Sequence, residues 1–192
     1  MENSPKISNG AKASFSFILE IIKIVIIALA IVIPIRYFVF QPFFVQGSSM
    51  EPNFHNGDYL IIDEISYRVL GDPQRGDVVV FKFPNDPTKR FIKRIVGLPG
   101  ETIEVKDGKV IIDEDSEKIV LDESIYLPES FKTPDCKPVS LEEGEYFVLG
   151  DNRPHSLDSE DWGILPGENI IGKVVFRAWP FAVLAKVEAP GY

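Results

Sequence analysis

An uninterrupted apolar run near the start of the chain constrains this protein more than any other feature. The run extends from Ile24 to Ile35, and with its apolar neighbours it reaches about twenty residues, which is the length that a helix needs to cross a bilayer. Lys23 and Arg36 bracket the run and can extend their charged ends towards opposite interfaces. We therefore expect a transmembrane anchor over residues 15–40.

A buried helix of a soluble protein and a cleavable signal peptide are the alternatives to an anchor. A cleavage site should follow the apolar run, but the small-residue motif Ala28-Leu29-Ala30 lies inside it. The sequence therefore favours an uncleaved anchor, preceded by a short stub of residues 1–14.

The distribution of basic residues predicts the orientation of this anchor. Lys6, Lys12 and Lys23 lie on its N-terminal side, whereas Arg36 is the one basic residue in the stretch that follows it. This positive-inside bias keeps the N-terminal stub in the cytoplasm. Residues 41–192 are then expected on the extracytoplasmic side.

Charge and rare residues exclude several kinds of partner. The net charge is -9, and the largest basic clusters are Lys89-Arg90 and Lys93-Arg94, so nucleic acid is not an expected partner. One cysteine, Cys136, rules out a disulfide within the chain, and it is expected to be a bystander thiol in a turn. The two histidines, His55 and His155, lack the supporting ligands of a zinc site, so no metal is expected.

Residues 41–192 carry short apolar runs that predict an all-β domain of antiparallel sheets. Turn signals separate the runs, and Asp107-Gly108 between Val105 and Val110 is the clearest hairpin. The expected strands are Asp58–Ile65, Asp77–Phe83, Arg90–Val96, Thr102–Val105, Lys109–Ile112, Glu145–Leu149 and Lys173–Ala178.

Residues 102–143 form a region that we expect to vary, as a hairpin or flap. Within it, the acidic and proline-containing stretch Asp113–Pro138 is interpreted as a solvated tip. The cluster Asp113-Glu114-Asp115 with Glu117 superficially resembles calcium ligands. It lacks the mid-loop glycine and the terminal glutamate of a calcium loop, so no calcium site is predicted.

Four segments carry residues that suit catalysis. They are Gly47-Ser48-Ser49-Met50-Glu51-Pro52, Phe91-Ile92-Lys93-Arg94, Gly150-Asp151-Asn152-Arg153 and Ser156-Leu157-Asp158-Ser159. In the first segment a serine pair follows a glycine, in a turn that can present a hydroxyl beside backbone N–H groups. Such a serine can equally be an ordinary turn residue.

Lys93 is the most informative of these residues. Alternation along the expected strand places Lys93 on the same face as Phe91 and Ile95, which is the face that we expect to be buried. Because burial disfavours the charged form of an amine, a desolvated lysine can serve as a general base towards a serine hydroxyl. Taken alone, Lys93 can equally be a strand-edge lysine whose amine reaches water.

Together, the four segments resemble those of type I signal peptidases in order and spacing. Gly47-x-Ser49-Met50-x-Pro52 is similar to the nucleophile motif of that family, and Ile92-Lys93-Arg94 is similar to its base motif. The stretch from Gly150 to Asp158 is similar to its supporting motif. The resemblance covers the anchor and nearly the whole domain.

The resemblance implies a role for each matching residue. Ser49 would attack the scissile carbonyl, and neutral Lys93 would take its proton and later deliver it to the leaving amine. Ser156 would orient the lysine amine, and Asp151 and Asp158 would hold the surrounding loop. The backbone N–H of Ser49 would contribute to the oxyanion hole.

The resemblance also implies how a substrate binds. The segment Phe43–Gln46 and the strand around Phe91 would receive the substrate as an added β-strand. Val45, Met50 and Phe91 would line small apolar pockets that select small residues before the cut. The implied substrate-binding residues are Val45, Gln46, Gly47, Met50, Phe91 and Ile92.

The implied function is that of a membrane-bound serine endopeptidase that removes signal peptides from exported preproteins after small-x-small motifs. The resemblance implies no cofactor. The implied partners are preproteins and the lipid bilayer, and the export translocon is left open as a third. The implied location is the cell membrane, with a thylakoid membrane as the alternative.

Two positions depart from the pattern of the family. Many members carry an arginine two residues after the aspartate of the supporting motif, whereas this chain has Glu160, so the ion pair of Asp158 would use Arg153 or be absent. Some members place a serine at the position of Gly47, where this chain offers no side chain for the oxyanion hole.

Three other functions compete with this interpretation. A Ser49–His155–Asp158 hydrolase is the enzymatic alternative. A self-cleaving repressor would need a DNA-binding module, for which residues 1–40 leave no room. A catalytically inactive, membrane-tethered binding domain is the third, and the presence of both Ser49 and Lys93 argues against it.

Overall fold

The computed structural model describes residues 9–38, 40–69, 71–114, 117–180 and 184–190 of the chain. The chain divides into two compact units, residues 1–39 and residues 40–192. Residues 1–8 of the expected stub and Asp115 of the acidic cluster lie outside the described residues, as do the side chains of Lys12 and Arg36.

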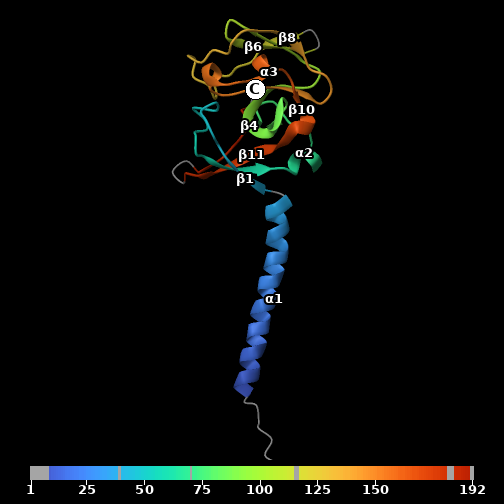
Figure 1. Cartoon of the computed structure of the whole chain (residues 1–192), viewed down its shortest axis with the longest axis vertical. Helices are drawn as coiled ribbons and strands as arrows, with labels where there is room; N and C mark the ends of the chain where they lie inside the picture. Colours follow the sequence, from blue (N-terminus) through green and yellow to red (C-terminus); the bar gives the residue numbers. More distant parts are fainter. Residues whose placement is uncertain (1–8, 39, 70, 115–116, 181–183, 191–192) are drawn as a thin grey trace, which may run out of the picture. The chain divides into compact units, whose positions relative to one another are not determined.

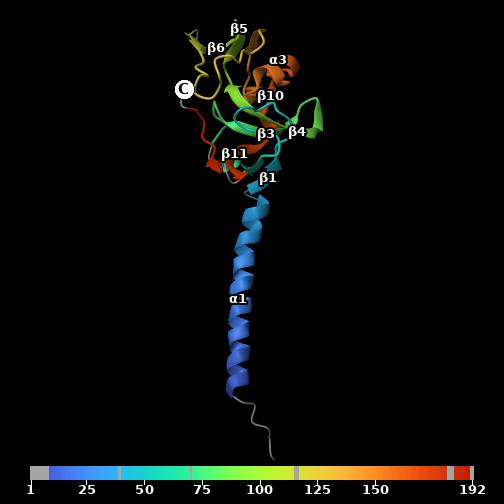
Figure 2. The same cartoon turned by 90° about the vertical axis from the view of Figure 1, so that its left-hand side faces the viewer.

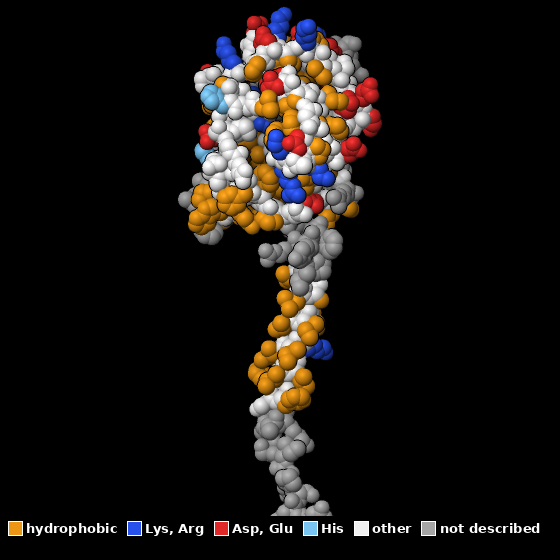
Figure 3. All heavy atoms as spheres, in the orientation of Figure 1, with side chains coloured by type: hydrophobic (Ala, Val, Ile, Leu, Met, Phe, Trp, Pro, Cys, Tyr) orange, Lys and Arg blue, Asp and Glu red, His pale blue; other side chains and the backbone are white. Residues whose placement is uncertain are grey.

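The first unit contains one long helix, α1 (Asn9–Phe38). Its segment Ser14–Val32 has a mean hydropathy of 2.7, and the side chains of this segment are exposed. Figure 3 shows that they are almost all hydrophobic. An α-helix satisfies its own backbone hydrogen bonds, so this one is long and apolar enough to cross a membrane. The expected anchor extended to residue 40, but α1 ends at Phe38 and Phe40 begins a strand.

The second unit is built on two antiparallel sheets, which confirms the all-β prediction. An eight-stranded sheet has the order β1-β2-β11-β3-β4-β9-β10, with β12 paired to β11, and a four-stranded sheet has the order β7-β6-β5-β8. Figures 1 and 2 show the four-stranded sheet at the opposite end of this unit from β1 and β11. The strands of the large sheet are β1 (Phe40–Phe44), β2 (Tyr59–Asp63), β3 (Val78–Phe83), β4 (Asp86–Gly97), β9 (Glu145–Leu149), β10 (Leu165–Pro166), β11 (Ile170–Trp179) and β12 (Ala185–Lys186). Those of the small sheet are β5 (Thr102–Lys106), β6 (Lys109–Glu114), β7 (Glu117–Val120) and β8 (Cys136–Ser140).

Short helices lie in three of the connections between strands. α2 (Ser66–Val69) follows β2, while η1 (Arg153–His155), α3 (Ser159–Trp162) and η2 (Gly167–Asn169) lie between β9 and β11.

The β5–β6 hairpin confirms the prediction made from Asp107-Gly108. These two residues form a two-residue turn with positive φ angles of 53° and 79°, and Val105 faces Val110 across the ladder. Asparagine or aspartate followed by glycine is the preferred pair for such a turn, because both central residues need φ > 0.

The hydrophobic core consists of three clusters of buried side chains, two against the large sheet and one beneath the small sheet. The first contains Val45, Met50, Phe54, Leu60, Ile62, Val78, Val80, Ile92 and Val174. The second contains Val79, Phe81, Ile95, Tyr146, Val148 and Leu165. The third, under the small sheet, contains Val96, Ile103, Val105, Val110, Ile112, Leu121, Leu141, Phe147 and Leu149.

The interpretation of Asp113–Pro138 as a solvated tip is wrong for its middle part. β7 is exposed, as expected of a hairpin tip, but Leu121, Leu127 and Thr133 are buried. This stretch packs against the domain because Leu121 joins the core cluster of the small sheet and because Glu123 and Thr133 contact Arg153.

Candidate active site

Sheet topology brings two of the four catalytic segments together. β9 pairs with β4 so that Leu149 faces Arg94. Gly150 and Asp151 follow β9 directly, so the chain leaves the sheet beside Lys93. Segments that are far apart in the sequence therefore meet at one end of a strand pair.

Lys93 is buried, as its position in the expected strand predicted, with 3% of its side chain exposed. Its amine lies 2.8 Å from Asp158 Oδ1 and donates a hydrogen bond to Ser156 Oγ. Ser156 in turn donates to Asp158 Oδ1, and the Gly150 N–H donates to Asp158 Oδ2 at 2.7 Å. Asp158 therefore connects the Lys93 amine on β4 to Gly150, at the start of the loop after β9.

Ser49 is half-buried and lies in the loop that follows β1. The Asn152 N–H donates to the Ser49 carbonyl at 2.9 Å, and the Asn152 side-chain amide donates to the Ser48 carbonyl at 3.0 Å. A Cβ at Gly150 would collide with both Ser156 Oγ and the Ser49 carbonyl. The close approach of these loops therefore requires glycine at position 150.

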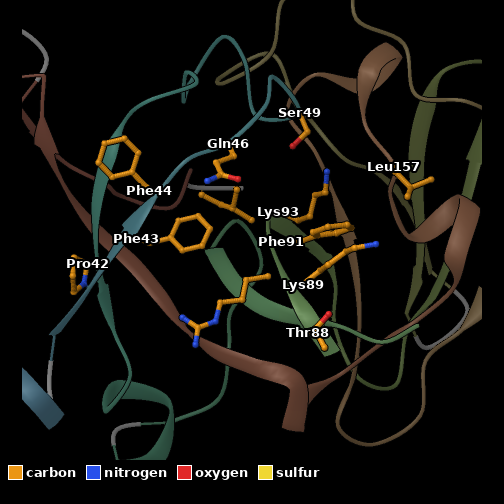
Figure 4. A pocket seen from close by; sticks show the side chains of 12 residues that line it. Pro42, Phe43, Phe44, Gln46, Ser49, Thr88, Lys89, Phe91, Lys93 and Leu157 are labelled. Carbon is orange, nitrogen blue, oxygen red and sulfur yellow. The ribbon is translucent and has the colours of Figure 1, made fainter. Parts of the chain in front are cut away.

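A cavity of about 690 Å³ lies in front of Ser49 and Lys93. Figure 4 shows the end of the Lys93 side chain turned towards Ser49, although no hydrogen bond between these two side chains is present among the described residues. The cavity is lined by Pro42, Phe43, Phe44, Gln46, Ser49, Thr88, Lys89, Arg90, Phe91, Ile92, Lys93 and Leu157.

Three of the six expected substrate-binding residues, Gln46, Phe91 and Ile92, line this cavity. Val45 and Met50 do not, because their side chains are only 2% and 1% exposed and lie in the core cluster around Ile92. Gly47 is also outside the lining, and its N–H donates to Asn56 at 3.0 Å.

Asp151 has a strong partner that the sequence did not indicate. Arg94 donates two hydrogen bonds to its carboxylate, at 2.8 and 2.7 Å, and both side chains are buried. Asn53, close to the nucleophile loop, donates a third at 2.8 Å. A bidentate arginine pair with a further donor satisfies a buried carboxylate well.

Arg153 does not pair with Asp158. The sequence left open an ion pair of Asp158 with Arg153 or none at all, but Asp158 pairs with Lys93. Its guanidinium is fully buried and donates to Glu123 Oε2 at 2.8 Å and Oε1 at 2.5 Å, and it also donates to Thr133. Burial alone lowers the pKa of Arg153, but the hydrogen bonds and the charge of Glu123 raise it overall. No signal in the sequence identified Glu123, because the burial of Arg153 became visible only in the structure.

Glu160 has the opposite environment. Its carboxylate oxygens are buried, and neither has a hydrogen-bond partner from another described residue. Burial, and then the charge of Asp158, raise the pKa of Glu160 to about 7. At the position where the resemblance implied an arginine, this chain therefore places an acid close to Asp158, and the charge of Arg153 offsets the rise in its pKa only in part.

The geometry does not favour the other site that the sequence suggested. His155 is exposed, and Asp158 is occupied by Lys93, Ser156 and Gly150, so the Ser49–His155–Asp158 arrangement does not form. Cys136 is partly buried, and burial raises the pKa of its thiol, which disfavours a nucleophilic thiolate. Among the described residues, no group of three His, Cys, Asp or Glu side chains could hold a metal ion.

Comparison with known proteins confirms the family that the sequence resembled. The model of the family described as "Signal peptidase, peptidase S26" matches residues 18–179. Probable signal peptidase I-2 of Synechocystis sp. is 41% identical over 84% of this chain and 73% of that protein. Probable signal peptidase I-1 of the same organism is 37% identical over 94% of this chain and 89% of that protein.

Among solved structures, the crystal structure of a signal peptidase I from Enterococcus faecalis V583 is similar, with 32% identity and a TM-score of 0.44. It covers 54% of this chain and 97% of the other chain. The family model and the two relatives, matched across most of the sequence, lead to one conclusion: this chain belongs to the signal peptidase family, peptidase S26, as a serine endopeptidase of the type I signal peptidases.

Proposed function

We propose that this protein removes N-terminal signal peptides from exported preproteins, with Ser49 as the nucleophile and the neutral amine of Lys93 as the general base. One observation carries the proposal. Ser49 and Lys93 line the same cavity, and the lysine amine is buried, held by Ser156 and turned towards the serine.

The reaction would proceed in two steps. Lys93 takes the proton of the Ser49 hydroxyl while Ser49 Oγ attacks the scissile carbonyl. When the tetrahedral intermediate collapses, Lys93 gives this proton to the leaving amine, and an acyl-enzyme remains. Water then attacks the acyl-enzyme with Lys93 again as the base, which releases the signal peptide and restores the serine.

The supporting residues would act before and during these steps. Ser156, which accepts a hydrogen bond from Lys93, fixes the direction of the amine, and Asp158 holds Ser156. The N–H of Ser49 points its partial charge at the oxyanion, where a preorganised donor lowers the barrier. Asp151 and Arg153 hold the loop through Arg94 and Glu123.

The substrate would bind as an extended strand between the segment before Ser49 and the first half of β4. Among the described residues, β9 pairs with β4 only from Arg94 to Gly97, so the preceding stretch has no strand partner on that side. An added strand gains main-chain hydrogen bonds there, and side-chain pockets then supply specificity. Phe91, Ile92 and Gln46 line the cavity where small residues before the cut would fit.

The membrane would be the site of the reaction. α1 would anchor residues 15–38 in the cell membrane with the N-terminal stub in the cytoplasm, and residues 41–192 would face the extracytoplasmic side. A thylakoid membrane is the alternative location, and the export translocon is a candidate neighbour. Ser49 follows α1 after a short stretch of chain, which suits a cut close to the bilayer surface.

Cleavage of a preprotein with an Ala-x-Ala site tests this proposal. We would compare the detergent-solubilised wild type with Ser49→Ala and Lys93→Ala, and use Ser48→Ala as the matched control because Ser48 is the adjacent, exposed hydroxyl. Wild type and Ser48→Ala should cut after the second alanine, and the other two should be inactive. An inert wild type, or cleavage by Lys93→Ala, would reject the assignment.

A further inference from the structure

A buried ion pair connects the acidic stretch to the catalytic loop. Glu123 accepts two hydrogen bonds from Arg153, whose guanidinium is completely buried. The same guanidinium donates through Nε to the Gly150 carbonyl at 2.9 Å. Gly150 in turn donates its N–H to Asp158, which contacts Lys93. A short chain of contacts therefore leads from Glu123 to the proposed general base.

Tyr126, three residues after Glu123, provides a second connection, this time to the nucleophile side. Its carbonyl accepts a hydrogen bond from Asn53 at 2.8 Å, and the same amide group donates to Asp151. Its ring lies under the guanidinium of Arg94 at 4.3 Å, and its hydroxyl donates to Glu123 at 2.6 Å. Asn53 lies three residues beyond Met50 in the same loop as Ser49.

We propose that Glu123 and Tyr126 form a clamp, and that Glu123 is a positioning residue for catalysis. The clamp holds the loop of Ser49 through Asn53 and the loop of Ser156 and Asp158 through Arg153. This inference rests on the proposed function of Ser49 and Lys93, and it assigns the acidic stretch a role in fixing the distance between them.

The charge of Glu123 is the critical part of this clamp. Without it, the Arg153 guanidinium would be buried with no carboxylate in contact, and it would move towards water or towards another acid. Either movement withdraws the hydrogen bond to the Gly150 carbonyl and shifts the loop that carries Ser156. A displacement of about 1 Å in such a loop can lower a catalytic rate by about 100-fold.

The test compares Glu123→Gln with Glu129→Gln in the full-length, detergent-solubilised protein. Glu129 is an exposed acid of the same stretch, so its variant removes the same charge without touching the clamp. We expect Glu123→Gln to lower kcat by about 30-fold with KM changed by less than about 2-fold. Glu123→Asp keeps the charge and should recover part of the loss, and Glu129→Gln should match the wild type.

Two further measurements separate positioning from simple loss of folding. Thermal melting must show that the variants are folded at the assay temperature, and the pH of half-maximal kcat/KM should move in Glu123→Gln, because the contacts of Lys93 change. Asn53→Leu breaks the other arm of the clamp and should lower kcat in the same way, which keeps the test decisive if Glu123→Gln does not fold.

Each outcome has a definite meaning. If wild type cleaves, Ser49→Ala does not, and Glu123→Gln has the kcat and pH midpoint of Glu129→Gln, the clamp is refuted while the proposed function stands. The same conclusion holds if Asn53→Leu, used in its place, behaves as wild type. If wild type does not cleave, the proposed function fails and the clamp fails with it.

Discussion

The loop after β9 has two halves that treat buried charge differently. In residues 150–153, each charged group is part of a guanidinium–carboxylate ion pair: Asp151 pairs with Arg94, and Arg153 pairs with Glu123. In residues 156–160, the carboxylates of Asp158 and Glu160 lie close together, and the amine of Lys93 is the basic group in contact with Asp158. The charges of the first half are therefore paired, whereas the second half has more carboxylates than basic groups in contact with them.

This difference matches two different tasks. Arginine stays charged under all ordinary conditions and forms bidentate pairs, so it suits a fixed framework. Lysine can lose its proton when it is buried, so it suits a group that must accept and return one. In the proposed mechanism, the arginines Arg94 and Arg153 would fix the geometry of the site, and Lys93 would carry the proton.

Lys93→Arg should have the largest effect, because it places an arginine where the proposed mechanism needs a lysine. A cation would remain beside Asp158, but a guanidinium does not act as a neutral base, so cleavage should fall by about 1000-fold or more. The larger group should also cost about 1–3 kcal/mol of unfolding free energy through overpacking. Lys82→Arg, at an exposed position on β3, should retain activity. Residual cleavage that still depends on Ser49 would show that another base operates.

Arg94→Met tests the framework half of the loop. It leaves the Asp151 carboxylate buried without its ion pair, so urea denaturation should show a loss of about 3–5 kcal/mol. The double variant Arg94→Met/Asp151→Asn should regain part of this loss, since the buried charge is then gone. Arg90→Met, at an exposed position on the same strand, should change stability by less than about 0.5 kcal/mol. Equal effects at positions 90 and 94 would contradict the framework role.

Ser156→Ala tests the catalytic half in a milder way. A hydrogen bond to a charged group contributes about 1.5–3 kcal/mol, so kcat/KM should fall by about 10- to 150-fold while the protein stays folded. Ser140→Ala removes a hydroxyl that is bonded to Thr102 on the exposed surface, and it should leave kcat/KM unchanged. An unchanged rate for Ser156→Ala would mean that the lysine amine needs no orienting hydroxyl.

The features that the sequence predicted well depend on local chemistry. The Asp107-Gly108 turn formed because two residues suffice to define it. The strands β7, β8, β10 and β12 were not among the expected ones. β8 contains Pro138 and lies at the edge of the small sheet, where proline is tolerated, while β10 and β12 have only two residues each.

The candidate site shows the same limit. Alternation predicted the burial of Lys93 correctly, but residues 92–97 are buried on both faces, so the periodicity alone could not select Lys93 as special. The motif spacing did select it. The partners Arg94 and Glu123 were not predicted, because spacing along the chain does not show which distant charge enters a buried site. Glu123 in particular lies in a stretch whose composition is typical of a solvated loop.

Glu160→Gln should have the smallest effect of these variants, and it tests whether the second half of the loop carries an unpaired carboxylate. Burial and the charge of Asp158 raise the pKa of Glu160 from 4.5 to about 7, so the charged form is penalised in the folded state. Stability from the protonated acid is therefore full below pH 4.5 and is lost as the pH rises through 7. The side chain is partly exposed, so we discount the shift for solvent screening and expect Glu160→Gln to stabilise the protein by about 1 kcal/mol at pH 8.

Measuring the unfolding free energy of both proteins from pH 4 to pH 8 isolates this carboxylate, because the other groups titrate in both. The two curves should coincide at pH 4, diverge as the pH rises from 4.5 to about 7 and run parallel above that, with the glutamine variant higher. A variant that is less stable at pH 8 would mean that Glu160 has a cationic partner in solution. The carboxylates of the second half of the loop would then be paired, as the charged groups of the first half are.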